Sequence, residues 1–240
     1  MPKISVCVPV YTMKDNMSEK FLVEFFSNLV EQTFKDFEVV VSDQSTFDYL
    51  RSITDTFSHV LDINYVRNTS EKKSAANNVN HAVKHAKGEI VKLLYMDDFF
   101  VDPNALEKIA KAFDENPGKW LIAGFVNCNE ERSQFYNPRT PWYGNAYVNG
   151  DNTTGNPSNY SVRRECALEM DENLAWIVDG EYFYRSYYHY GMPIMLEDIL
   201  VCFRDHGDSA FKKDSFRELD AKERQYCVDK FSGVVEHKLI

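Results

Sequence analysis

Long apolar runs and cysteine motifs are both missing from this 240-residue sequence. No apolar run reaches the roughly 18 to 20 residues that a membrane-spanning helix needs, and the N-terminal MPKISVCVPV lacks the residue order of a signal peptide. The cysteines form no CxxC pair and are widely scattered, so neither a zinc site nor a disulfide framework is indicated. They are Cys7, Cys128, Cys166, Cys202 and Cys227. We therefore expect a cytoplasmic protein with no integral membrane segment, whose cysteines are mostly small core residues.

Positive charge and glycine-rich loops are also scarce. The chain carries 27 basic and 37 acidic residues, a net charge of −10, which disfavours nucleic acid and anionic membranes as partners. No GxGxxG follows any apolar strand pattern, which excludes a dinucleotide-binding dehydrogenase. The segment VPVYTMKDN has no glycine either, and this disfavours a nucleotidyltransferase, which needs such a loop to hold a triphosphate.

What the sequence does have is a regular alternation of strand and helix patterns through its first half. Such alternation is typical of a parallel sheet covered by helices, an α/β fold. The predicted strands are 4–10, 37–42, 64–67, 90–96 and 120–126, and the predicted helices are 19–32, 71–86 and 104–115.

The second half begins with a segment of no sustained period, residues 130–159, which we expect to be a long loop. Aromatic residues punctuate this loop and its end, and flat rings with polar rims suit sugar faces as well as ordinary packing. They are Tyr136, Trp142, Tyr143, Tyr147 and Tyr160. A helix over 175–190, a strand over 199–203 and a charged amphipathic helix over 215–231 are predicted to follow.

The run EIVKLLYMDDFFVD, residues 89–102, places two adjacent carboxylates after an apolar strand. Open α/β sheets bind their ligands at the carboxyl ends of such strands. Paired hard oxygen ligands there suit Mg²⁺ or Mn²⁺ held together with substrate phosphates. The alternative is a solvated Asp-Asp turn, which the motif alone does not exclude.

Several ordered pieces of the chain together carry a family resemblance. They are ISVCVPVYT, LVEQTFKDFEVVVSDQST, SAANNVNHAVKHAKGEIV, YMDDFF, IVDGEYFYR and FRDHGDSAF. In order and spacing they resemble the inverting family 2 glycosyltransferases with the GT-A fold, over nearly all of residues 3–209. The arrangement is similar to bacterial spore-coat and capsule polysaccharide sugar transferases.

This resemblance implies a single GT-A domain over 1–240, with a Rossmann-like, mostly parallel central sheet flanked by helices, a long acceptor-side loop and a C-terminal helix. Residues 1–100 would form the nucleotide-binding half, 101–210 the acceptor-binding half and 211–240 a helical extension. The implied nucleotide contacts are Pro9, Val10, Tyr11, Asp43, Asn77, Asn80 and Asp97.

The aspartate that ends the second strand would determine which nucleotide base is bound. Asp43 would accept a hydrogen bond from the N3–H of a uracil-type ring, and cytosine has no proton at that atom. The resemblance therefore favours a UDP- or dTDP-sugar donor. The alternative for Asp43 is a turn former or helix cap in DQST.

For the adjacent carboxylates, the resemblance implies that Asp97 contacts the ribose while Asp98 and His206 hold Mn²⁺ or Mg²⁺. The family often has an Asp-x-Asp motif, whereas Phe99 occupies the place of a third aspartate here. That departure leaves open which of the two aspartates holds the metal. A lone histidine can also be structural.

Asp179 in IVDGEYFYR is the implied catalytic base, with Glu181 as the fallback. The expected function is inverting hexosyl transfer from a nucleotide-diphosphate sugar to a saccharide, lipid-linked or protein acceptor. A catalytically inactive nucleotide-sugar or glycan-binding homologue stays the alternative, and a sugar-phosphate nucleotidyltransferase a weaker one.

Overall fold

One mixed sheet organises the computed structural model, which describes residues 1–144, 152–207 and 214–232, with the side chains of 214–218 left aside. The strand order is β3-β2-β1-β4-β8-β6-β9-β5, and β7 pairs with the edge of β6. The strands are β1 Ile4–Val10, β2 Phe37–Asp43, β3 Ile63–Arg67, β4 Ile90–Leu93, β5 Phe99–Phe100, β6 Trp120–Asn129, β7 Phe135–Arg139, β8 Tyr160–Arg163 and β9 Ile194–Asp205.

Strand β1 is the centre of the parallel part of the sheet. It pairs in parallel with β2, where Ile4 lies opposite Phe37, and with β4, where Ile4 lies opposite Ile90. Every residue of β1 and β2 is buried, as expected for strands covered on both faces. Because the three strands run the same way, their carboxyl ends lie at one edge of the sheet.

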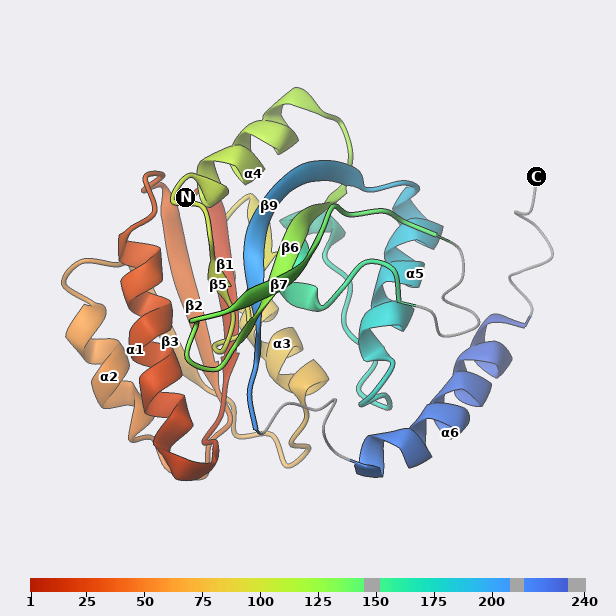
Figure 1. Ribbon diagram of the computed structural model, residues 1–240, viewed down its shortest axis with the longest axis horizontal. Helices are drawn as coiled ribbons and strands as arrows, with labels where there is room; N and C mark the ends of the chain where they lie inside the picture. The colour runs from red at the N-terminus through yellow and green to blue at the C-terminus, as the bar shows by residue number, and fades with distance from the viewer. Residues whose placement is uncertain (145–151, 208–213, 233–240) are drawn as a thin grey trace.

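Helices cover both faces of this sheet (Figure 1). One core cluster packs the sheet against α1 Met17–Val30, α2 Leu50–Phe57 and α4 Ala105–Glu115. The other packs it against α3 Ala75–Lys84, α5 Val178–Tyr190 and α6 Asp214–Phe231. Alternate residues of β1 serve the two sides, since Val6 and Val8 join the first cluster and Cys7 the second.

The main strands and helices predicted from sequence are confirmed, with shifted ends. The predicted strand 199–203 is the middle of the longer β9, and the predicted helix 175–190 begins only at Val178. Helix α2 and the short strands β5, β7 and β8 were not predicted. The region 130–159 is also less irregular than expected, because it contains β7 and the 3-10 helix Pro157–Asn159.

The aromatic residues of that region have different roles. Tyr160 and Tyr143 are buried, and the Tyr160 hydroxyl contacts the Ser186 hydroxyl at 3.1 Å, so both rings pack in the core. Trp142 and Tyr136 are exposed by 58% and 37%, and the Tyr136 hydroxyl donates to the Asp205 carboxylate at 3.3 Å. Tyr147 lies outside the described residues.

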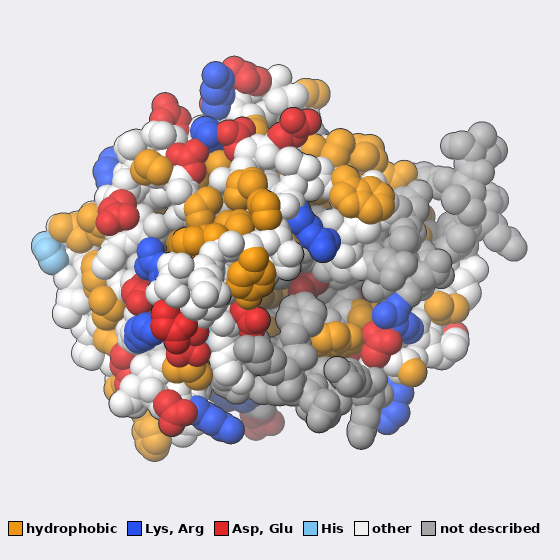
Figure 2. Space-filling model, in the orientation of Figure 1, with side chains coloured by type: hydrophobic (Ala, Val, Ile, Leu, Met, Phe, Trp, Pro, Cys, Tyr) orange, Lys and Arg blue, Asp and Glu red, His pale blue; other side chains and the backbone are white. Residues whose placement is uncertain are grey.

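The cysteines, the helices and the surface charge can be compared with what the sequence predicts. All five cysteines are buried and free, as expected. Within the described ranges, no helix combines the length and apolar character needed to cross a bilayer. On the face in Figure 2, the described Lys and Arg side chains lie singly among acidic ones and form no broad basic area.

Gly88, in the bend that precedes β4, lies very close to the backbone of β1. A Cβ there would lie 2.5 Å from the Ser5 nitrogen and 2.7 Å from the Ile4 carbonyl carbon. We expect Gly88→Ala to lower the free energy of unfolding by about 1–3 kcal/mol, because β1 must shift to accept the methyl group. Urea denaturation measures this, with Gly207→Ala as control, since no atom lies within 4 Å of a Cβ there. Equal effects of the two changes would contradict this packing account.

Candidate functional site

The carboxyl ends of β1 and β2 are joined by the buried side chain of Asn78 at the start of α3. Its amide nitrogen donates to the Val10 carbonyl at 3.0 Å, and its amide oxygen accepts from the Ser42 hydroxyl at 2.7 Å and from Asn68 at 3.1 Å. Ser74 caps the helix by accepting from the Asn77 N–H. The start of α3 is thereby fixed against the edge of the sheet where α/β folds bind ligands.

Asp43 ends β2 with a carboxylate that is fully buried and already hydrogen-bonded. It accepts from the Ser45 N–H at 2.7 Å, the Tyr65 hydroxyl at 2.5 Å and the Arg67 guanidinium at 2.7 Å. Its contact with a nucleotide base stays a prediction. A nucleotide base at this strand end would contact Arg67 as well as Asp43. The sequence pattern did not indicate a role for Arg67.

The other residues expected to contact the nucleotide lie in different places. Pro9 and Val10 are buried within β1, whereas Tyr11, just after the strand, is exposed by 38%. Asn77 accepts from Asn68, which follows β3, at 3.0 Å, and both Asn77 and Asn80 contact the segment at 170–172. Their amide nitrogens donate to the Glu172 carboxylate at 3.0 and 3.3 Å.

Asp98 is buried, and both of its carboxylate oxygens accept hydrogen bonds from the protein. One accepts from the Arg204 N–H at 3.0 Å and the other from the Asn156 amide at 3.0 Å. Burial, followed by the negative charge of Asp97, raises the pKa of Asp98 to about 7. These contacts join the turn after β4 to β9, and the metal role expected of Asp98 stays a prediction.

Asp97 lies beside His206, which directly follows β9. The Asp97 carboxylate and the His206 Nε2 are 3.0 Å apart, and the Asp97 side chain is partly open to solvent. Phe21 packs against the imidazole edge to face, with ring centroids 5.2 Å apart. The structure therefore pairs His206 with Asp97, whereas the sequence reasoning paired it with Asp98.

A carboxylate and an imidazole are suitable ligands for Mn²⁺, and Mg²⁺ accepts the carboxylate. Among the described residues, no group of three His, Cys, Asp or Glu side chains converges as a metal site. The protein side chains here offer two ligands. Such cations commonly take the rest of their coordination from water and substrate phosphates.

Asp179 stands in the first turn of α5. Burial, followed by the negative charges of Asp179, Asp97 and Asp98, holds the pKa of Tyr95 far above its usual value, so all three carboxylates act on this one phenol. Burial raises the pKa of Asp179 to about 7. A carboxylate with such a pKa can gain and lose a proton near neutral pH.

Glu181, the fallback base, is committed to ion pairs. It is buried and binds Arg185 at 2.5 and 2.9 Å and Lys230 at 2.8 Å. Both of its carboxylate oxygens are therefore engaged by cationic side chains. This arrangement favours Asp179 over Glu181 as the base.

The family model described as "Glycosyl transferase family 2" matches residues 5–219, which is most of the chain. The chain belongs to glycosyl transferase family 2. The predicted family membership is thus confirmed, and the strand ends described above are those of a glycosyltransferase domain.

Curated relatives of moderate sequence identity are also glycosyltransferases. "Glycosyltransferase GlyG" of Streptococcus pneumoniae is 30% identical over 55% of this chain and 42% of its own length. The "GalNAc(5)-diNAcBac-PP-undecaprenol beta-1,3-glucosyltransferase" of Campylobacter jejuni is 32% identical over 55% of this chain and 43% of its own. The aligned part of the chain thus spans less than half of either relative.

Solved structures confirm the GT-A fold. TarS of Staphylococcus aureus in complex with UDP-GlcNAc superposes with a TM-score of 0.74 at 19% identity, over 94% of this chain and 66% of that one. A Pyrobaculum calidifontis mannosyltransferase in complex with GDP-Man and Mn²⁺ gives 0.63 at 17% identity, over 98% and 64%. At these identities the likeness concerns the fold alone.

Two carboxylates of α5 should affect stability in opposite directions. The Asp179 pKa is about 7 in the folded protein against an ordinary 3.8. The folded state therefore holds a proton that the unfolded state releases, and this carboxyl lowers stability as pH rises from about 4 to 7. We expect Asp179→Asn to raise the melting temperature at pH 8, with the gain shrinking toward pH 4.

Glu181→Gln is the matched comparison, and it should lower stability at pH 8 by about 1–3 kcal/mol, because it weakens the buried pairs with Arg185 and Lys230. Differential scanning fluorimetry across pH 4–8 measures both variants. A loss of stability in Asp179→Asn at pH 8 would contradict the assigned desolvation of Asp179.

Proposed function

We propose that this chain transfers a sugar from a UDP- or dTDP-sugar to an acceptor hydroxyl, with inversion and with the help of a divalent cation. One observation carries the proposal. Asp97 and His206 pair at 3.0 Å where β4 and β9 end, and the charges of Asp97 and of Asp179 in α5 both act on Tyr95, so the two carboxylates share one neighbourhood. A diphosphate site and a proton acceptor close to each other are what direct displacement at a sugar carbon requires.

The donor's base would lie over the ends of β1 and β2. The Asp43–Arg67 pair at 2.7 Å offers a guanidinium and a carboxylate at one place, and a uracil-type ring presents both carbonyl oxygens and an N–H. The two solved relatives carry different nucleotide sugars, UDP-GlcNAc and GDP-Man. The preference for uracil or thymine therefore rests on Asp43.

The cation would be held by Asp97 and His206, with donor phosphates completing its coordination. When bound, it supplies Lewis-acid stabilisation of the leaving diphosphate. Asp98 then has a supporting role, since its contacts with Arg204 and Asn156 fix the turn that presents Asp97. The Mn²⁺ in the archaeal mannosyltransferase complex agrees with this choice of cation.

Asp179 would act as general base. As the acceptor oxygen forms its bond to C1, the bond from C1 to the diphosphate oxygen breaks and that oxygen keeps the electron pair. The acceptor's hydroxyl proton moves to the Asp179 carboxylate. Burial suits this step because it brings the carboxyl pKa close to the working pH.

The acceptor would supply the hydroxyl that attacks the sugar. The names of two relatives specify poly(ribitol-phosphate) and an undecaprenol-linked glycan, so a saccharide or a lipid-linked saccharide fits this chain as well as a protein does. Exposed Trp142 and Tyr136 offer rings for such an acceptor. A cytoplasmic location belongs to the same proposal and is supported by the five free cysteines.

Nucleotide binding tests the metal assignment. We expect UDP or dTDP with Mn²⁺ to raise the melting temperature by several degrees in a screen that includes GDP, CDP and ATP. Asp97→Asn should abolish the Mn²⁺-dependent part, whereas Asp98→Asn should retain it. The reverse pattern would place the cation on Asp98, and no shift with any diphosphate would contradict an active transferase.

Rate measurements test the base. We expect Asp179→Asn to slow transfer by roughly 10²–10⁴-fold without weakening UDP binding, because the amide cannot accept the proton. UDP release from UDP-sugars gives the rate, with water as acceptor if no other is found. A variant that retained a tenth of the wild-type rate would exclude Asp179 as the base.

A further inference from the structure

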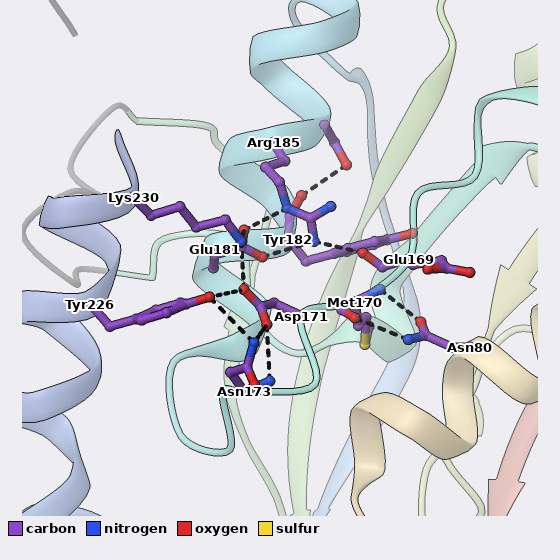
Figure 3. A network of polar contacts seen from close by, with 11 residues as sticks. Asn80, Glu169, Met170, Asp171, Asn173, Glu181, Tyr182, Arg185, Tyr226 and Lys230 are labelled. Atoms are coloured by element: carbon purple, nitrogen blue, oxygen red, sulfur yellow. Dashed lines mark hydrogen bonds and ion pairs between the residues drawn. The ribbon is translucent and has the colours of Figure 1, made fainter. Parts of the chain in front are cut away.

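The terminal helix α6 is anchored to the helix that carries Asp179. Lys230 donates to the Asp171 carboxylate at 2.5 Å and to Glu181 on α5 at 2.8 Å, and the Tyr226 hydroxyl donates to Asp171 at 2.8 Å (Figure 3). These contacts hold α6 against both α5 and the segment that precedes it. The side chains on this part of α6 therefore have fixed positions relative to the start of α5.

Glu223, two turns before Lys230, reaches the start of α5 directly. Its carboxylate accepts three backbone hydrogen bonds, from the N–H groups of Ala175 at 2.9 Å, Trp176 at 2.9 Å and Ile177 at 3.0 Å. The residue is only 6% exposed. The N–H groups at and before a helix start have no partner within the helix, so a buried carboxylate that binds three of them fixes the local backbone.

Asp179 depends on that backbone for its position. It is two residues beyond Ile177, and burial is the cause of its raised pKa. Within the described residues, no hydrogen bond reaches its carboxylate from another side chain or from the backbone. The place of the carboxylate therefore follows from the first turn of α5, which Glu223 holds.

We propose that Glu223 is a positioning residue for the base Asp179, and this rests on the function proposed above. The family model ends at residue 219, so Glu223 lies beyond the matched residues. The catalytic unit of this chain then includes α6. Without the Glu223 carboxylate, three N–H groups would lose their partner and the turn that carries Asp179 would shift toward water or other acceptors.

A double-mutant cycle tests this by UDP release from the best UDP-sugar substrate. Glu223→Ala should lower kcat on the order of 10²-fold, since small misplacements of a catalytic group have effects of this size. The donor KM should change less than about threefold, because the nucleotide site is on other elements. Glu223→Gln should recover much of the rate, because the amide oxygen still accepts hydrogen bonds.

Asp220→Ala is the matched control on the same helix. Asp220 binds the Trp176 indole N–H at 3.0 Å, so its removal loosens the same segment while the backbone bonds to Glu223 remain. We expect a kcat within about threefold of wild type. A loss as large as that of Glu223→Ala would show that α6 acts only by docking, and would overturn the proposal.

The Asp179→Asn background separates positioning from general damage. If Glu223 acts through Asp179, Glu223→Ala should cause no further loss of rate in that background, because the effects of substitutions at interacting residues do not add. A full additional loss would overturn the positioning role. If Asp179→Asn alone keeps its rate, the base assignment fails, a result distinct from failure of the Glu223 proposal. Should Glu223→Ala not fold, Glu223→Gln takes its place in the cycle, with a smaller but equally non-additive loss expected.

Discussion

The parallel pairing of β1 with β2 and with β4 is the constraint on which the rest of this structure depends. It brings the ends of three strands, and with them Asp43 and the turn that carries Asp97, to one edge of the sheet. Helix α3 then closes that edge through Asn78, and the bond from the Arg204 N–H to Asp98 brings the end of β9 and His206 to the same place. The candidate site thus forms where the ends of β1, β2, β4 and β9, which are distant in sequence, come together.

The carboxylates in and around the site divide into two kinds. Those with partners, Asp43 beside Arg67 and Glu181 between Arg185 and Lys230, hold segments together. Asp98 and Asp179 have no cationic side chain as a hydrogen-bond partner within the described residues, and burial raises the pKa of each to about 7. The second kind costs stability at neutral pH, which is a common property of groups that take part in catalysis.

The sequence predicts the elements whose pattern is local and strong. β1 and β2 are rich in apolar residues, so both were expected at nearly their observed bounds, and the apolar stripe of α3 predicted that helix over 71–86, where the structure has Ala75–Lys84. Strand β8 has four residues and α2 only two buried ones, Leu50 and Thr54, so neither gives a clear period. Their presence depends on pairing and packing with segments distant in sequence.

The candidate site was predictable to the level of motif but not of side-chain direction. Asp179 and His206 stand in recognisable segments, yet the choice between Asp97 and Asp98 depends on which way each points after β4, and that is set by Arg204 and Asn156. Likewise the sequence pattern did not single out Asn78, whose amide joins the ends of β1 and β2.

The most direct measurement is the anomalous signal of Mn²⁺ in crystals grown with UDP. The account predicts a peak within coordination distance of Asp97 and His206, and a peak bound to Asp98 instead, or none at these strand ends, would contradict it.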